Sequence, residues 1–371
     1  MSETALASAS VKQKWISSYF KEYIRESGFM PYMGKSAQSI IISKYELQQE
    51  AGKTINIPLI TRLKSTGRTG AQVLEGFEEQ LGNFNCAISV DWRRNGVVVP
   101  KSESYKTEID LLNAARDMLR AWEAEQLRDD IIRAMLSVVT TGDTTVNLAD
   151  STAANRNAYA AANQDRLLFG QLLSNYSATF ATALGNVDTT NDKADAAKMS
   201  LMKRLAKNAD PHIRPFRTGD GREYYVAFHG SRTFRDLKAD SVITNANRDS
   251  RAREGNGMDD NPLFQDGDLI YDGVIHREVP EIDDIAGNGG AAFTLNGAGA
   301  ASADVRPVFM CGAQAVGIAW GQEPTPRTDL ARDYSFRPGV AIEELLGVKK
   351  MAFNGKQHGV VTGFFAAAAD S

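Results

Sequence analysis

The chain has 371 residues, with 42 basic and 46 acidic side chains and a formal net charge of -4. Proteins that hold nucleic acid by neutralising its phosphates usually carry a basic excess, so the composition argues against that class. Cys86 and Cys311 are the only cysteines, which favours reduced thiols over a disulfide framework. Residues 1–10 lack the apolar core of a signal peptide, and the most continuous apolar stretch, 308–320, is too short to span a bilayer. These features predict a soluble protein that is made in a cytoplasm.

Residues 1–50 have the character of an arm. Residues 11–24 can form a helix that carries an aromatic face. This face lies near a free terminus and consists of Trp15, Tyr19 and Phe20. Glycine and proline then interrupt the pattern before a second short helix, which is predicted over 40–50. Such an arm packs either on its own subunit or across a neighbouring one, and the sequence leaves both alternatives open.

Two strands joined by a long polar connection are predicted next. Apolar and polar residues alternate over 54–63 and again over 84–92, which is the period of a strand. Pro58 cannot donate a ladder hydrogen bond, so the first strand should lie at an edge or carry a bulge. The connection, 64–83, is rich in glycine and charged residues. Because an isolated two-stranded ribbon is marginal in water, this extended arm should need a partner surface, such as a neighbouring subunit.

The longest periodic stretch runs from 104 to 139. Its apolar residues recur three and four positions apart, which predicts one helix with a single buried stripe. The predicted core positions of this stripe are Met118, Trp122, Ile131 and Met135. At about 1.5 Å per residue, the helix would be roughly 54 Å long. Either it is a long core helix of an ordinary enzyme, or it is a spine that links two separate lobes.

The rest of the chain mixes helical and strand-like segments. Helices are predicted over 167–184, 194–209 and 231–238. Strands are predicted over 224–228, 268–279, 305–320 and 340–365. A loop is predicted over 245–260 and a loop or an interrupted hairpin over 283–302, and the stretch 140–163 is polar and poor in large apolar groups. A buried strand followed at once by a helix is the α/β step of a compact lobe.

No part of the sequence argues for catalysis. Two runs, 34–36 and 52–54, end like phosphate-binding loops, but each lacks the required first glycine and a preceding strand. The histidines show no metal-ligand spacing, and they form no zinc pattern with the two cysteines. Asp266, Asp268 and Asp272 lack the glycine and the terminal glutamate of a calcium loop. We therefore predict no catalytic, cofactor-binding or metal-binding residues, and no cofactor.

Five blocks in a fixed order carry a family resemblance. The first is the acidic segment LEGFEEQL at 74–81, and the second is the strand–helix step YYVAFH with FRDL at 224–237. The other three lie at 261–275, 311–321 and 347–360. Together they resemble the major capsid proteins of tailed bacteriophages with the HK97-like fold, and more closely the N4-like phage capsid family. The resemblance extends over nearly the whole chain.

The resemblance implies an HK97-like α+β fold with an N-arm, an extended β-hairpin loop, a long spine helix, and peripheral and axial domains. The implied ranges are an N-terminal arm at 1–50, an extended loop at 51–99, a peripheral domain with the spine helix at 100–189, an axial domain at 190–320, and C-terminal strands that return to the peripheral domain at 321–371. The arm and the loop should then contact other subunits. Besides the three aromatic residues of the arm, the expected contact residues are Leu74, Glu75, Phe77, Glu78, Glu79 and Leu81.

The resemblance also implies a function. The chain would be a major capsid protein that self-assembles as pentamers and hexamers into the icosahedral shell around the double-stranded DNA of a tailed bacteriophage. Its partners would be copies of itself, portal and scaffolding proteins, and a decoration or cement protein. It would enclose DNA without sequence-specific binding, involve no membrane, belong to the virion, and assemble in the bacterial host cytoplasm.

Two other functions are weighed against this one. The main alternative is a soluble α/β enzyme or ligand-binding protein, against which stands the lack of a convergent polar constellation. The other is a nucleic-acid-binding protein, which only the basic cluster at 198–217 favours. A helix with such a cluster more often presents a solvated face than a nucleic-acid surface.

Overall fold

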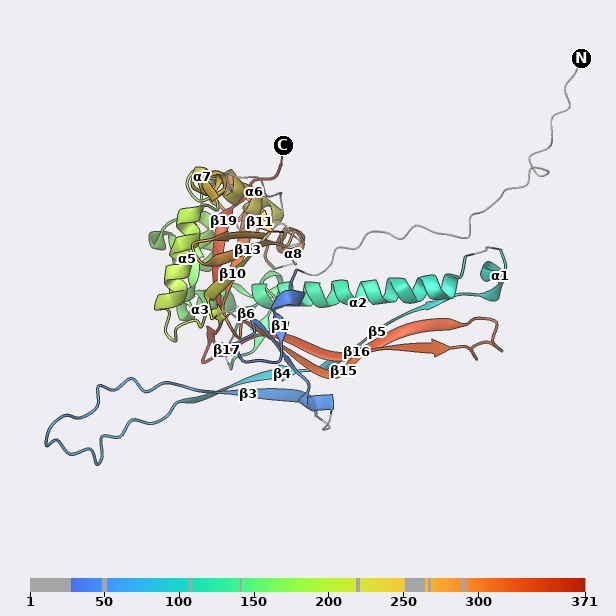
Figure 1. Cartoon of the computed structure of the whole chain (residues 1–371), viewed down its shortest axis with the longest axis horizontal. Coiled ribbons are helices and arrows are strands. Elements are labelled where there is room, and N and C mark those ends of the chain that lie inside the picture. Colours follow the sequence, from blue (N-terminus) through green and yellow to red (C-terminus); the bar gives the residue numbers. More distant parts are fainter. Residues whose placement is uncertain are drawn as a thin grey trace, which may run out of the picture. The chain divides into compact units, whose positions relative to one another are not determined.

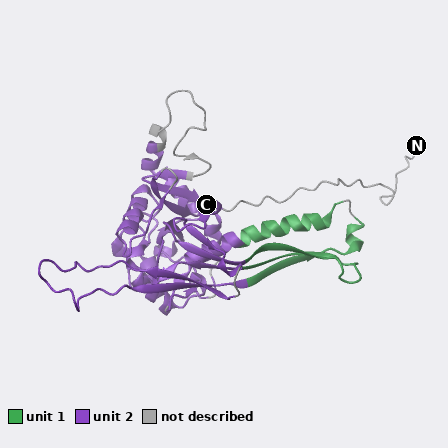
Figure 2. Ribbon diagram, turned by 60° about the horizontal axis from the view of Figure 1, so that its bottom comes forward, with its two compact units in different colours: residues 1–27, 92–126, 322–345 green, residues 28–91, 127–321, 346–371 purple. Residues whose placement is uncertain are grey.

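A computed structural model describes most of the chain (Figure 1). The described residues are 28–48, 52–106, 109–140, 142–217, 221–250, 264–265, 268–287, 290 and 292–370. They fall into two compact units, shown in Figure 2. Unit 1 contains the described residues of 92–126 and 322–345, and unit 2 those of 28–91, 127–321 and 346–371. No helix among the residues so described is both long and apolar enough to cross a membrane.

The core of unit 2 is an eight-stranded mixed sheet. Along its main path the strands follow the order β11-β12-β13-β10-β14-β19-β8, and β9 pairs with β10. Their bounds are β8 Leu167–Phe169, β9 Phe216–Arg217, β10 Glu223–His229, β11 Phe264–Gln265, β12 Asp268–Tyr271, β13 Val274–Glu278, β14 Val305–Cys311 and β19 Val360–Ala366. The pairs β10–β14 and β14–β19 are antiparallel, whereas β10–β13 and β19–β8 are parallel. The predicted strand at 224–228 is therefore confirmed. β14 lies within the predicted segment 305–320, and β19 overlaps the end of the predicted segment 340–365.

Both faces of this sheet are covered, which explains its continuous apolar strands. Successive side chains of a strand point to opposite faces. In β14, Val308 and Met310 pack with α5 and α6, whereas Phe309 and Cys311 pack with the end of α2 and with α8. Every residue of β14 and of β19 is buried as a result. Strands that are buried on both sides read as apolar runs and not as alternating patterns.

Short helices surround the sheet of unit 2. They are α3 Ala153–Ala162, α4 Phe180–Gly185, α5 Ala196–Asn208, α6 Ser231–Ala239, α7 Ser241–Ser250 and α8 Glu281–Gly287. The helices predicted over 194–209 and 231–238 are confirmed by α5 and α6. The Asp195 side chain caps α5 by accepting a hydrogen bond from the Lys198 amide at 2.9 Å. The loop predictions over 245–260 and 283–302 are wrong at their starts, where α7 and α8 lie.

Two helix predictions in unit 2 are wrong. Residues 167–169 form β8, because this apolar run pairs with β19 and is fully enclosed. Within the predicted helix over 167–184, only 180–184 is α-helical, as part of α4. In place of a helix over 40–50, the chain forms β2 Ile41–Lys44 and a 3-10 turn, Glu46–Gln48. Consecutive isoleucines are stiff and favour a strand, and β2 pairs in parallel with β1 Met33–Gly34 and with β15.

The predicted spine helix is shorter than expected. It is α2 Leu111–Leu136, with a separate turn, α1 Lys101–Ser104, before it. Its 26 residues give a length of roughly 39 Å. Val138 and Val139 form β6, which pairs with β7 Thr145–Val146. The prediction of one helix over 104–139 is therefore wrong at both ends.

The two halves of α2 are buried differently, each within its own unit. In unit 2, Ile131 and Met135 are fully buried in the main apolar cluster. In unit 1, the buried residues of the helix are Ala115 and Leu119, which pack on Val340 and Ile342 of β16. Trp122 is partly buried against that cluster.

Met118 departs from the predicted stripe of α2. Its side chain is 37% exposed, so its assignment to the core is wrong for the single chain. Side chains four positions apart lie on one face of a helix, and in this half of α2 that face passes through Ala115 and Leu119. The neighbouring Met118 is turned about 100° away from Leu119.

A second sheet uses strands from several parts of the chain. Its order is β1-β2-β15-β16-β5, with bounds β5 Asp91–Val98, β15 Val316–Asp329 and β16 Gly339–Lys350. Two small hairpin strands follow it, β17 Ala352–Phe353 and β18 Lys356–Gln357. Residues 321–371 contribute strands to both sheets, β16 to this one and β19 to the eight-stranded one.

The predicted hairpin at the start of unit 2 is confirmed. It consists of β3 Thr54–Ile60 and β4 Asn83–Ser89, an antiparallel pair that joins Thr54 to Ser89 and Ile60 to Asn83. The pair forms a separate two-stranded sheet, so Pro58 lies on an edge strand. The connection 61–82 contains no helix or strand, and it runs away from the hairpin as an extended loop (Figure 1).

Candidate assembly surfaces

The extended loop, residues 61–82, carries large apolar side chains in solvent. Leu74, Phe77 and Leu81, all predicted contact residues, are 58%, 62% and 64% exposed. Val73 is exposed beside them. Exposed apolar residues that gather on one segment mark a surface for interaction, whereas scattered ones need no explanation. The loop is therefore the first candidate for contact with another molecule.

Hydrogen bonds within the loop give it a defined shape. The backbone amides of Lys64 and Ser65 donate to the two carboxylate oxygens of Glu79 at 2.6 and 2.7 Å, which joins the two limbs. These bonds lower the pKa of Glu79. The Arg68 guanidinium lies 3.7 Å from the centre of the Phe77 ring. The loop thus holds its exposed residues in place.

The three acidic residues predicted as contacts differ in what they touch. Glu79 bridges the limbs, and Glu78 accepts a hydrogen bond from the Gly76 amide at 2.8 Å. Reversing either charge would therefore disturb the loop itself as well as any contact with a neighbour. Glu75 is exposed, and within the described part of the chain it has no hydrogen bond or ion pair. Of the three, Glu75 is the residue best able to meet a partner.

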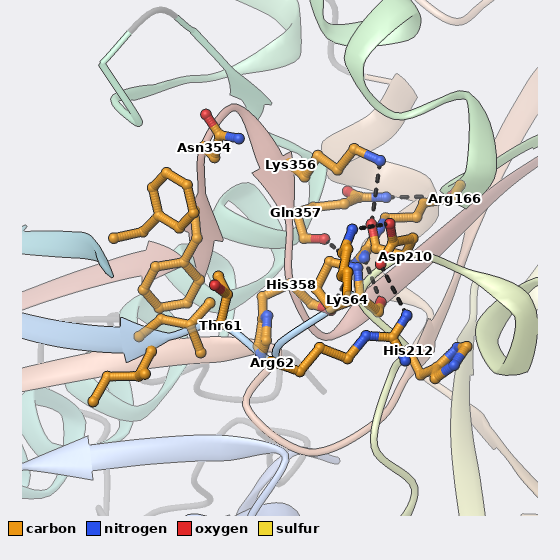
Figure 3. A pocket seen from close by; sticks show the side chains of 15 residues that line it. Thr61, Arg62, Lys64, Arg166, Asp210, His212, Asn354, Lys356, Gln357 and His358 are labelled. Carbon is orange, nitrogen blue, oxygen red and sulfur yellow. Dashed lines mark hydrogen bonds and ion pairs between the residues drawn. The ribbon is translucent and has the colours of Figure 1, made fainter. Parts of the chain in front are cut away.

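A cleft of about 380 Å³ lies at the base of the loop (Figure 3). Arg62 and Lys64 both reach Asp210 there, at 3.3 and 2.5 Å. The hydrogen bond from Lys64 is the main reason that the pKa of Asp210 is lowered. Lys356 lies 3.3 Å from a carboxylate oxygen of Asp165. The contacts of Arg62 and Lys64 with Asp210 join the base of the loop to the body of unit 2.

A buried polar network lies behind the cleft. The fully buried Arg166 donates to the backbone carbonyls of Gln357, His358 and Pro211. Gln357 in turn accepts a hydrogen bond from the Tyr159 hydroxyl at 2.7 Å. Arg166 therefore fixes the backbone that forms one wall of the cleft.

Lys350 continues this network toward the end of α2. Its ammonium group donates to the Ser137 carbonyl at 2.6 Å and to Gln357 at 3.3 Å. Burial lowers the pKa of Lys350 to about 7, because removal from water disfavours the charged form. Ser137 directly follows the last residue of α2, so Lys350 links the helix C-terminus to the walls of the cleft.

Unit 1 presents an exposed aromatic set of its own. Tyr105 and Tyr334 are almost fully exposed, and Phe336 is 47% exposed. Tyr334 lies in the turn between β15 and β16, where it and its two neighbours, Asp333 and Ser335, all have positive φ. Non-glycine residues in this conformation cost free energy, so the turn is strained.

The structure offers no assembled metal site among the residues it describes. No group of three or more histidine, cysteine, aspartate or glutamate side chains gathers there. His229 and His276 meet as a buried pair, with 3.0 Å between Nε2 and Nδ1. Burial lowers the pKa of both rings, that of His276 to about 3. Asp272, considered above for calcium, instead contacts Ser200 and Lys203.

Sequence reasoning found the loop but missed the cleft. Arg62 and Lys64 precede Asp210 by almost 150 positions, and no local pattern connects them. The three arm residues, Trp15, Tyr19 and Phe20, lie outside the described residues. The structure therefore tests no contact of the arm.

Comparison with known proteins identifies the family. A family model described as "Phage capsid protein" matches residues 3–364. The chain belongs to the phage capsid protein family. The capsid asymmetric unit of cyanophage Pam1 is 50% identical, with all of both chains covered and a TM-score of 0.91. The phage capsid resemblance predicted from the sequence is confirmed.

More distant relatives agree with this assignment. The chain is 26% identical over 369 residues to the "Major capsid protein" of Pseudomonas phage KPP25, covering 96% of this chain and 95% of that protein. The capsid of Ralstonia phage GP4 is 20% identical with full coverage of both chains and a TM-score of 0.73, which supports the fold. The HK97-like α+β fold is thus confirmed. The alternative of an α/β enzyme finds no support in these comparisons.

Proposed function

We propose that this chain is the major capsid protein of a tailed bacteriophage, and that it self-assembles as pentamers and hexamers into an icosahedral shell around double-stranded DNA. Membership in the phage capsid protein family and the 50% identity to a cyanophage capsid chain support the class of protein. The extended loop supports assembly through this particular surface. Copies of the same chain are its main partners.

The observation that carries the proposal is the contrast between the defined shape of the loop and its exposure. Bonds from two backbone amides to Glu79 tie the limbs together. Yet Leu74, Phe77 and Leu81 are more than half exposed. Leaving such side chains in water forfeits about 1.5–3 kcal/mol each relative to full burial. A loop shaped in this way is suited to burying its apolar residues on another subunit.

The finer roles follow from the family resemblance. Portal and scaffolding proteins, and a decoration or cement protein, are the further partners. The shell holds DNA without reading its sequence, which agrees with the net charge of -4. The virion is the site of function, and the host cytoplasm is the site of assembly.

The domain names are part of the same proposal. The arm is 1–50, the β-hairpin region that includes the extended loop is 51–99, the peripheral domain is 100–189, and the axial domain is 190–320. The last range, 321–371, is divided: β16 joins the sheet of β5 and β15, whereas β19 joins that of β10 and β14.

Electron microscopy of the purified full-length chain, together with sedimentation, tests the proposal. We expect shells, rings or tubes whose mass is many times that of one chain. An enzyme or a ligand-binding protein would give compact particles of low and fixed mass. A compact monomer at every concentration and ionic strength would contradict the proposal.

A further inference from the structure

We propose that the cleft at the base of the extended loop receives residues 73–78 from the loop of a second copy. This inference rests on the proposed function, because it names the acceptor for the surface that the loop presents. Each subunit would then offer one loop and one cleft. A contact between two different surfaces repeats from one copy to the next. It forms a closed ring when the rotation that relates neighbouring copies allows closure.

The charge of the cleft favours an acidic partner. Its lining contains four cationic side chains, Arg62, Lys64, Arg166 and Lys356, and one carboxylate, Asp210. Asp165 lies beside Lys356 but outside the lining. Each cation has a carboxylate partner within the chain, Asp210 for Arg62 and Lys64 and Asp165 for Arg166 and Lys356. Four cations against two carboxylates still leave a formal excess of two positive charges at the cleft.

The cleft also has an apolar wall. Leu59, Ile60 and Phe84 from the hairpin line it together with Phe353. Ile60 is 69% exposed in the single chain, so part of this wall lies in solvent. A volume of about 380 Å³ is in the range of clefts that bury groups of ligand size, and it can admit an aromatic side chain with its neighbours.

Residues 73–78 have the matching chemistry. Val73, Leu74 and Phe77 supply exposed apolar groups, and Glu75 supplies a carboxylate without a partner among the described residues. An acidic and apolar segment thus meets a basic and apolar cleft. Complementary charges steer association and fix register, while the apolar groups supply the area that is removed from water.

The loop of the same chain does not fill this cleft. Phe77 lies six positions before the start of β4, which is roughly 20 Å along an extended limb. The loop runs away from the strands that form the cleft (Figure 1). A second copy, displaced by about the length of the loop, brings its residues 73–78 to this cleft.

Site-specific cross-linking in the assembled particle tests the proposal. A photoreactive benzophenone amino acid replaces Phe77, which keeps an aromatic group at that position. Particles are built from an equal mixture of heavy-isotope and ordinary chains, so that mass spectrometry separates links between copies from links within one. We expect links between copies that end in 59–64, 84 or 353–358. The same group at the exposed Tyr105 is the matched control and should not reach these residues.

The outcomes separate this inference from the proposed function. Links between copies that end only elsewhere, for example in 92–126 or 322–345, would overturn the cleft as acceptor while leaving the shell function intact. Links confined to one chain would overturn it as well. Failure of the unsubstituted chain to assemble would instead contradict the proposed function.

A charge exchange provides a second test. Glu75→Lys and Lys356→Glu should each lower the particle yield by about tenfold, and the double variant should restore most of it. Thermal melts of the unassembled variants check that each subunit is folded. Two folded single variants with wild-type yield would overturn the placement of Glu75 beside Lys356 in the cleft, as would a folded double variant that assembles no better than either single one.

Discussion

Strand β19 and the extended loop lie in the same unit of the chain, but the apolar residues of β19 are buried whereas those of the loop are exposed. All seven residues of β19 are buried, and Phe364 stacks on Phe169 with 5.3 Å between ring centres. In the loop, Phe77 is 62% exposed, and its ring contacts the guanidinium of Arg68. The same residue type thus contributes to the subunit core in one place and remains available for a neighbour in the other.

The difference indicates how the chain divides its apolar surface between folding and assembly. Burial in the sheet stabilises the subunit before it meets another copy. Each Å² of apolar loop surface that is buried on association should contribute about 25 cal/mol to its free energy. The stability of the isolated subunit and the yield of particles should therefore respond to different residues. The following predictions are ordered by their expected effect on the free energy of unfolding of the subunit.

Removing the Phe364 ring should have the largest effect. Phe364 touches the rings of Phe169 and Phe180 and is 2% exposed, so Phe364→Ala should lower the free energy of unfolding by about 3–5 kcal/mol. Denaturant unfolding of the unassembled subunit measures the loss. A change below about 1 kcal/mol would show that this aromatic cluster does not form the core.

Lys350 should make the stability of the subunit depend on pH. Its pKa falls from an ordinary value of 10.5 to about 7 on folding, because burial disfavours the charged form. Between these values the unfolded chain binds a proton that the folded chain does not, so the free energy of unfolding should rise with pH, by at most about 1.4 kcal/mol per pH unit.

Denaturant unfolding at pH 7 and pH 9 tests this dependence. Lys350→Met should remove the rise that is due to this group. The half-buried neighbour Lys349, which donates to the Ala87 carbonyl at 2.8 Å, gives the matched control Lys349→Met, and this variant should keep the rise. Identical pH profiles for the wild type and Lys350→Met would contradict the assignment.

Trp122 should have a moderate effect. Because its side chain is only partly buried against Leu119 and Val340, Trp122→Ala should cost about 1–2 kcal/mol and not the 3–5 kcal/mol of a fully buried aromatic residue. Tyr105→Ala, at an almost fully exposed position of the same unit, should leave stability unchanged. A melt of Trp122→Ala within error of the wild type would exclude Trp122 from the packing of unit 1.

Phe77→Ala should change the stability of the unassembled subunit least, by no more than about 0.5 kcal/mol, because the ring is mostly in solvent. The same variant should assemble poorly, since it removes the largest apolar group of the loop. Sedimentation of assembled and unassembled fractions measures this. Normal assembly of Phe77→Ala would contradict this prediction, because the exposed ring would then have no role between subunits, and its contrast with the buried Phe364 would have no bearing on assembly.

The sequence supported the parts of the fold that local patterns specify. The capped helix α5, the step from β10 to α6 and the hairpin of β3 and β4 all follow from periods and from nearby breakers. The short strands β2 and β8 were mistaken for helix, because their apolar runs fit either state until a distant strand pairs with them. Met118 was assigned to the core because the period defines a stripe only to within about one residue.

The candidate surfaces were predictable to different degrees. Acidic and apolar residues between two predicted strands indicated that the loop is a contact surface. An isolated two-stranded ribbon also needs support from a partner. The cleft forms only where the fold brings Asp210, Lys356 and the hairpin together, and no spacing along the chain predicts that arrangement. The hydrogen bonds from backbone amides to Glu79 could not be predicted from the sequence either, because they depend on the folded path of the loop.

The most direct test is a cryo-electron microscopy map of the assembled particle at side-chain resolution. We expect shells in which Leu74 and Phe77 of every subunit are buried against another copy of the chain. Shells in which these two side chains contact only solvent would contradict this expectation, whatever the quality of the remaining contacts.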